Sequence, residues 1–129
     1  MTDFETVLRE SEEIIFFAQN ELTEAKKEQN ELLARQVAEK GYLALIKGFN
    51  ALFIKKGKGT DELPKGERGR RFFIHAIEGK GLENFYGALR DRLHIDGFHE
   101  GIIIFDSLEE DLDEIEKFIS QVKDGGWNR

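Results

Sequence analysis

The sequence predicts an all-α protein, an antiparallel bundle of four to five helices around one core. Apolar residues recur at spacings of three and four along every long segment, which is the period of one helix face. No segment shows the apolar and polar alternation of a strand, and the chain has a single proline. A length of 129 residues fits one domain with one core. We therefore predict a domain over residues 1–123, followed by a frayed C-terminal tail over 124–129.

The first helix is predicted to begin at a capping box formed by Thr2 and Glu5, whose side chains each satisfy a backbone donor of the first turn. An apolar stripe then runs for about six turns. Its members are Phe4, Val7, Leu8, Ile14, Ile15, Ala18, Leu22 and Ala25. Asn30 is predicted to break this helix and to cap the next.

The second helix, over 31–56, is predicted to lie at the centre of the fold because it is apolar on most sides. Ala34, Gly41 and Gly48 fall at seven-residue intervals and so share a face. Glycine costs about 1 kcal/mol relative to alanine inside a helix, which indicates a close backbone approach to a neighbour. Either an internal contact or a homodimer seam explains that face, and a seam could also use the apolar stripe of the last helices.

The glycines and Pro64 of the segment 55–69 predict a loop, and a third helix follows over 67–78. Gly79 and Gly81 are expected to end that helix, so that a fourth begins near Leu82. Its stripe continues to Val122, but Ser107 and Glu110 form a second capping-box pattern. This helix is therefore expected to bend or restart within 96–107.

Composition excludes several classes of protein. The chain has no cysteine, which excludes disulfides, thiolate catalysis and cysteine-bound zinc. No apolar run approaches the roughly 18 residues that span a bilayer, and the N-terminus lacks the pattern of a signal peptide. We expect a cytoplasmic protein without a membrane segment.

A basic segment stands out in this acidic chain, whose net charge is −7. Residues 55–71 carry seven basic side chains against three acidic ones. Such a segment is either a solvated helix connection or a surface that contacts RNA. The residues predicted to bind RNA are Lys55, Lys56, Lys58, Arg70 and Arg71.

The three histidines of the chain are candidates for catalysis or metal binding. His75 is expected to be a partly buried or surface residue of the third helix. His94 and His99 flank Asp96, but they are five positions apart, and that spacing does not place both on one face of an α-helix. We therefore predict no metal site, and no cofactor.

Two segments resemble the HEPN superfamily of small helical bundles, most closely its archaeal paREP-type branch. They read Phe85-Tyr86-Gly87-Ala88-Leu89-Arg90-Asp91-Arg92-Leu93-His94-Ile95-Asp96-Gly97-Phe98-His99-Glu100-Gly101 and Ala38-Glu39-Lys40-Gly41-Tyr42-Leu43-Ala44. The resemblance implies a bundle of four or five helices that forms a homodimer. It also implies either a metal-independent ribonuclease of a toxin or defence system, or a noncatalytic module that contacts RNA, with a nucleotidyltransferase or antitoxin as a protein partner.

The nuclease signature of that superfamily is an arginine followed after four to six residues by a histidine. Arg92 and His99 fit this spacing, whereas His94 comes one residue too soon after Arg90. Histidine can move a proton and arginine can stabilise the phosphorane charge. The predicted catalytic residues are Arg92 and His99, assisted by His94. The function expected first is a noncatalytic or weakly catalytic HEPN-like module that contacts RNA or a protein. The alternatives are a metal-independent endoribonuclease and a purely structural or protein-interaction bundle.

Overall fold

A computed structural model describes residues 2–125 and shows five α-helices and no strand among them. The predicted all-α bundle is therefore confirmed. Two shorter helical segments join the five, a 3₁₀ turn (η1) and a π-helix (η2) that continues α4 without a break. The elements are α1 Asp3–Glu28, α2 Glu31–Lys55, η1 Thr60–Glu62, α3 Glu67–Glu78, α4 Lys80–Arg90, η2 Asp91–His99 and α5 Phe105–Lys123.

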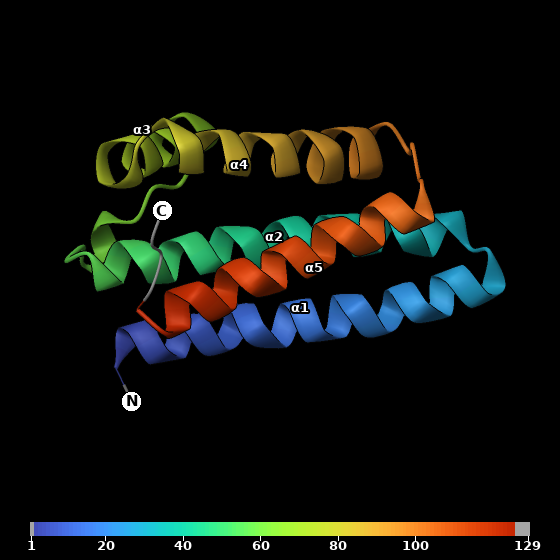
Figure 1. The fold of residues 1–129 in the computed structure, drawn as a ribbon, viewed down its shortest axis with the longest axis horizontal. Coiled ribbons are helices and arrows are strands. Elements are labelled where there is room, and N and C mark those ends of the chain that lie inside the picture. The colour runs from blue at the N-terminus through green and yellow to red at the C-terminus, as the bar shows by residue number, and fades with distance from the viewer. Residues whose placement is uncertain (1, 126–129) are drawn as a thin grey trace.

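The helices lie in layers (Figure 1). α1 runs along one side of α2, and α5 packs on both, so these three long helices share most of the apolar core. α3 and the rod formed by α4 and η2 lie together on the opposite side of α2. An extended segment at 100–104 takes the chain from η2 back to α5.

The two predicted helix starts of the first half are confirmed. Thr2 caps α1, and Glu5 completes the capping box by accepting a hydrogen bond from the Thr2 backbone. Asn30 caps α2 by accepting a hydrogen bond from the Leu33 backbone. The break between the helices falls at Gln29, whose left-handed φ of 53° ends α1.

The small face of α2 makes an internal contact. A side chain at Gly41 would meet Leu112 of α5 at 2.6 Å, and one at Gly48 would meet Phe118 at 3.2 Å. The glycines therefore let α5 approach α2 within one chain. The apolar stripe of α4 and α5 is buried in the same core, through residues such as Leu89 and Ile115. Neither face proposed for a homodimer seam is available, and the homodimer itself stays a prediction.

Two predicted boundaries are wrong. α4 begins at Lys80, with Gly81 inside it, because Gly79 alone makes the break with a φ of 83°. Ser107 does not cap α5: the helix already begins at Phe105, and Ile104 holds the cap position without a side-chain hydrogen bond. The expected interruption within 96–107 is nevertheless present, since η2 ends at His99.

α5 ends at Lys123, and Asp124 and Gly125 form a turn after it. The rest of the predicted tail, 126–129, lies outside the described residues. Among the described helices, none is both long enough and apolar enough to cross a membrane.

Candidate functional site

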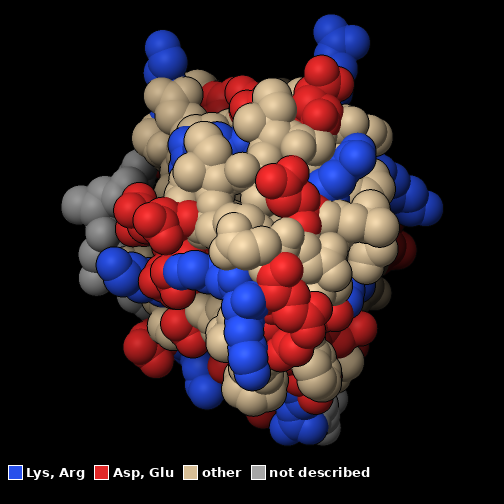
Figure 2. Space-filling model, turned by 90° about the vertical axis from the view of Figure 1, so that its right-hand side faces the viewer, with Lys and Arg blue, Asp and Glu red and all other residues tan. Residues whose placement is uncertain are grey.

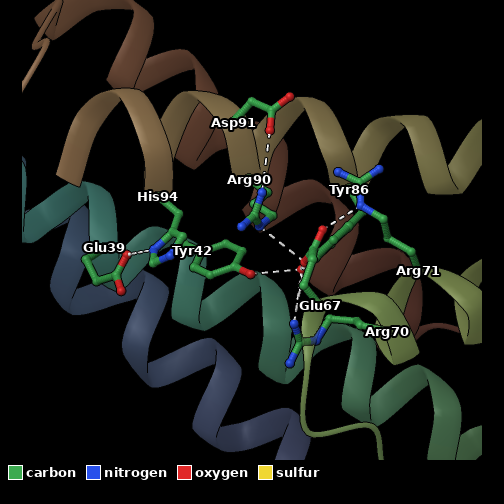
Figure 3. Close-up of polar contacts among 9 residues, drawn as sticks. All are labelled: Glu39, Tyr42, Glu67, Arg70, Arg71, Tyr86, Arg90, Asp91 and His94. Carbon is green, nitrogen blue, oxygen red and sulfur yellow. Dashed lines mark hydrogen bonds and ion pairs between the residues drawn. The ribbon is translucent and has the colours of Figure 1, made fainter. Parts of the chain in front are cut away.

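A carboxylate from α3 organises the polar side of the molecule. Glu67 receives hydrogen bonds from Tyr86 of α4 and from the Nε atom of Arg71, each at 2.5 Å. Arg90, at the end of α4, places its Nε atom 3.2 Å from the same carboxylate, within ion-pair distance. Figure 3 shows these side chains converging from the two helices. One carboxylate thus holds two guanidinium groups, that of Arg71 by a hydrogen bond from Nε and that of Arg90 by an ion pair.

The ionisation of this group follows from its surroundings. Burial raises the pKa of Glu67, but the hydrogen bonds from Tyr86 and Arg71 and the charge of Arg90 outweigh it, so the pKa lies below its ordinary value of 4.5. Burial also raises the pKa of Tyr86, and the contact with Glu67 raises it further. Tyr86 therefore remains a neutral donor, and Glu67 remains an acceptor, throughout the physiological range of pH.

The cluster extends inward to a buried arginine and to α2. Arg70 is only 7% exposed and donates to the Tyr86 hydroxyl at 3.1 Å. The Tyr42 hydroxyl of α2 lies 2.9 Å from that of Tyr86, so the two phenols share a hydrogen bond. These contacts tie α3 and α4 to α2 through polar groups, in addition to ring contacts such as Phe49 with Tyr86 and Phe53 with Phe73.

Tyr42 connects this cluster to a histidine. Its ring stacks on His94 with centroids 4.7 Å apart, and Glu39 lies 2.7 Å from the Nδ1 atom of His94 (Figure 3). A carboxylate on one ring nitrogen fixes the orientation of an imidazole and leaves the other nitrogen for a ligand. Orienting pairs of this kind are typical of general bases, although they also occur as structural contacts.

The π-helix brings together two histidines that were predicted to lie on different faces of a helix. In η2 the hydrogen bonds run from residue i to i+5, as between the Glu100 backbone N–H and the Ile95 carbonyl at 2.9 Å. This wider turn places His94 beside His99, with ring centroids 4.5 Å apart. The expectation that a five-residue spacing divides them between two faces is wrong, because it assumed an α-helix. Arg35 of α2 donates to the carbonyls of Phe98 and His99 and so stabilises the end of this segment.

Arg92, the predicted catalytic arginine, pairs with a residue other than the two histidines. Its Nε atom donates to both carboxylate oxygens of Asp111 of α5, at 3.0 and 3.1 Å, and its Nη2 atom lies 2.9 Å from one of them. The Asp111 side chain is 8% exposed, whereas that of Arg92 is 47% exposed. The structure thus brings His94 and His99 together and places Arg92 in a separate ion pair with a buried carboxylate.

The predicted RNA-binding residues are also divided. Lys55 donates to the Val122 carbonyl at 2.9 Å, and Lys56 pairs with Glu78 at 3.1 Å. Lys58 lies over the ring of Phe73. Arg70 is buried, so among the arginines of this segment only Arg71 joins the partly exposed part of the cluster.

Sequence reasoning missed Glu67, Tyr86, Arg90 and Glu39 as members of a polar cluster. Their spacing along the chain carries no motif, because the contacts cross from α2 to α3 and α4. One signal was present: Arg70 and Glu78 each lie four positions from Ile74 and so share its face of α3, which implies that polar groups fill part of that face. His75 lies outside the cluster and contacts Glu83 at 2.9 Å.

No group of three or more histidine, aspartate or glutamate side chains within residues 2–125 is arranged to bind a metal ion. What the cluster can do chemically follows from its donors. Arg71 and Arg90 both form ion pairs with Glu67, and their side chains are 35% and 24% exposed. Guanidinium groups held in this way can bind an anion such as a phosphate in a fixed orientation.

Comparison of this chain with models of known protein families, with curated proteins and with solved structures finds no match.

Proposed function

We propose that this protein is a noncatalytic or weakly catalytic HEPN-like module that contacts RNA. The observation that carries the proposal is the pair of arginines, Arg71 and Arg90, that Glu67 fixes from two different helices. Because each guanidinium faces Glu67 with its Nε side, its terminal nitrogens can donate to a phosphate. Arginines that are already ordered lose less conformational entropy on binding.

The charge balance supports an anionic ligand. Three arginines of the cluster face Glu67, while Asp91 lies at 3.8 Å from Arg90 and is 65% exposed. This leaves an excess of positive charge at one place in a protein whose net charge is −7. A localised cationic site on an acidic surface favours a few specific phosphate contacts over general binding to nucleic acid.

The ion pair of Arg92 with Asp111 favours weak catalysis or none. A phosphorane needs a cation oriented toward it, but the guanidinium of Arg92 is oriented toward Asp111 of α5 through Nε and Nη2. Freeing it would leave the Asp111 carboxylate buried without its partner, which is costly.

The second candidate is a metal-independent endoribonuclease, and the Glu39–His94 contact favours it. His94 would move the proton, with His99 beside it, and Arg90 in place of Arg92 would stabilise charge. Arg90 and His94 both project from the α4–η2 rod toward α2 (Figure 3). Such an enzyme should cut RNA in excess EDTA and leave a cyclic or 3′ phosphate.

The test is a titration of fluorescent single-stranded RNA in excess EDTA at several salt concentrations. We expect salt-dependent binding with little or no cleavage. Arg71→Ala and Arg90→Ala should each weaken binding about tenfold and lower the salt slope by about one. Arg68→Ala is the matched control: Arg68 also lies on α3, but it is exposed and forms no ion pair with the described residues.

Binding that is unchanged in Arg71→Ala and Arg90→Ala, or no binding at all, would overturn the proposal. Cleavage that His94→Ala abolishes would instead establish the second candidate. Cleavage that only Arg92→Ala and His99→Ala abolish would restore the residues expected from the sequence.

We further propose that the module forms a homodimer. Phe16 and Phe17 of α1, which are 59% and 60% exposed, support an association through a face that the chain leaves open. Light scattering should then give twice the monomer mass of 14.9 kDa. A monomer at high concentration would contradict it.

A further inference from the structure

A second feature of the α4–η2 rod has no role in the proposed phosphate contacts: a pocket of about 120 Å³ between η2, the extended segment 102–104 and the start of α5. Its walls are apolar, with Leu93 and Leu108 among them, and Gly97 lies where any side chain would meet Ala38 at 2.9 Å. Four polar side chains also line it: Arg92, Asp96, Ser107 and Asp111.

We propose that this pocket binds a single pyrimidine ring, the base of a nucleotide. Size is the first reason. An enclosed apolar cavity of about 150 Å³ holds a benzene molecule, so a pocket of about 120 Å³ that opens to solvent matches one six-membered ring better than the two fused rings of a purine. Pockets for drug-sized ligands are larger, about 300–1,000 Å³.

The polar groups are the second reason. Asp111 fixes Arg92 through Nε and Nη2, so the Nη1 group of Arg92 takes no part in that ion pair and can donate to a ring carbonyl. Asp96 is exposed and uses its backbone carbonyl, not its carboxylate, to accept from Ile102. Its carboxylate can therefore accept from a ring N–H or an amino group. The pocket lining thus offers both a donor and an acceptor, which are the groups that the edge of uracil or cytosine requires.

The exposed apolar residues at the rim are the third reason. Ile102 and Ile104 line the pocket, yet they are 58% and 64% exposed. A flat ring in the pocket would cover part of both side chains, and burying that surface favours binding. Figure 2 looks onto this end of the bundle, where charged side chains of both signs lie among uncharged ones, so the base rather than a run of phosphates is the ligand expected here.

That the pyrimidine belongs to an RNA strand rests on the proposed function. The fit of the ring to the pocket does not. Arg90 and Arg92 lie two residues apart on one rod whose diameter with side chains is about 10–12 Å. A strand whose phosphate binds at Arg90 could therefore place a neighbouring base in the pocket. A free pyrimidine nucleotide offers the same ring, and the experiment separates the two sources.

The experiment records amide NMR spectra of the full chain with uridine, cytidine or adenosine. We expect uridine or cytidine to shift the amides of Gly97 and Ser107, and adenosine to shift neither. Ser107→Leu should fill the pocket and abolish these shifts. Glu110→Leu adds the same side chain to an exposed position of α5 that does not line the pocket, and it should leave them unchanged. Thermal melting of both variants shows that they fold.

Asp96→Ala should weaken pyrimidine binding about tenfold, since its carboxylate reads the ring edge. Equal shifts with adenosine, or shifts that survive Ser107→Leu, would overturn the proposal. Titrations of short uridine and adenosine homopolymers then identify the source. Tighter binding of the uridine strand than of free uridine monophosphate assigns the pocket to RNA, and equal affinity assigns it to a free nucleotide. Arg71→Ala tests the phosphate contact in the same assay, so a failure there leaves the result for the pocket intact.

Discussion

The two sides of α2 are built from different chemistry. Toward α1 and α5 it packs apolar side chains. Among the described residues of α1 and α5, Ser11 and Asp111 are the buried polar or charged ones. Toward α3 it meets a helix whose buried residues are Arg70, Ile74 and Glu78. Two of those three carry charge, so hydrogen bonds and ion pairs there add to apolar contacts such as that of Phe53 with Phe73.

This difference separates stability from recognition. Apolar burial is non-directional and gives most of the folding free energy. A buried ionic cluster contributes little net stability, because desolvation of the charges offsets their attraction. Its members hold fixed orientations, however, and a fixed guanidinium is what an anionic ligand requires. The side of α2 that contributes least to folding thus carries the candidate binding groups.

The largest expected effect is on the apolar side. Gly48→Leu should lower the free energy of unfolding by about 2–3 kcal/mol, because the added side chain meets Phe118, Ile119 and Ser11, which lie 3.2–3.4 Å from a Cβ at this position. Denaturant titration followed by circular dichroism measures this. Gly48→Ala is the control: its methyl group needs only a small shift and gains about 1 kcal/mol of helix propensity. An equal loss in both variants would contradict close packing as the cause.

A smaller effect is expected on the polar side. Tyr86→Phe keeps the ring but removes the hydroxyl that donates to Glu67 and accepts from Arg70. Leaving these buried groups unsatisfied should cost about 1–2 kcal/mol. Hydrogen exchange should show faster opening of α3, while the amides of α1 keep the protection of the wild type. Uniform loss of protection would mean that the two sides of α2 unfold as one and that the comparison fails.

The sequence predicted one side better than the other for a physical reason. Helix periods and caps are local, so Thr2, Asn30 and the glycines of α2 could be interpreted from their neighbours in the chain. Hydrogen bonds of the polar side join residues such as Tyr42 and Tyr86, 44 positions apart, and no spacing rule covers them. The π-helix was not predicted either, because the predictions assumed the i to i+4 hydrogen bonds of an α-helix. That assumption alone separated His94 from His99.

The smallest expected effect is a change of stability with pH. The pKa of Glu67 is lowered on folding, because the contacts from Tyr86, Arg71 and Arg90 outweigh the effect of burial, which raises it. Between the folded and unfolded pKa values the unfolded chain binds more protons, so stability rises with pH there. The contribution of Glu67 is thus present above pH 4.5, its ordinary value, and is lost as the pH falls through the folded value. We expect an effect below about 1 kcal/mol, because the side chain is 29% exposed.

Glu67→Gln isolates this contribution from that of the other carboxylates, which titrate in both proteins. The difference in unfolding free energy between wild type and variant should be constant from pH 7 to pH 5 and should shrink below pH 4.5. Curves that stay parallel down to pH 3 would mean that Glu67 has no favourable partners in the folded state.

The same variant removes the anchor of Arg71 and Arg90. If Glu67 orients these arginines for a phosphate, RNA binding should weaken at pH 7 even though the variant carries more positive charge. Tighter binding would mean that Glu67 only competes with the ligand for the arginines.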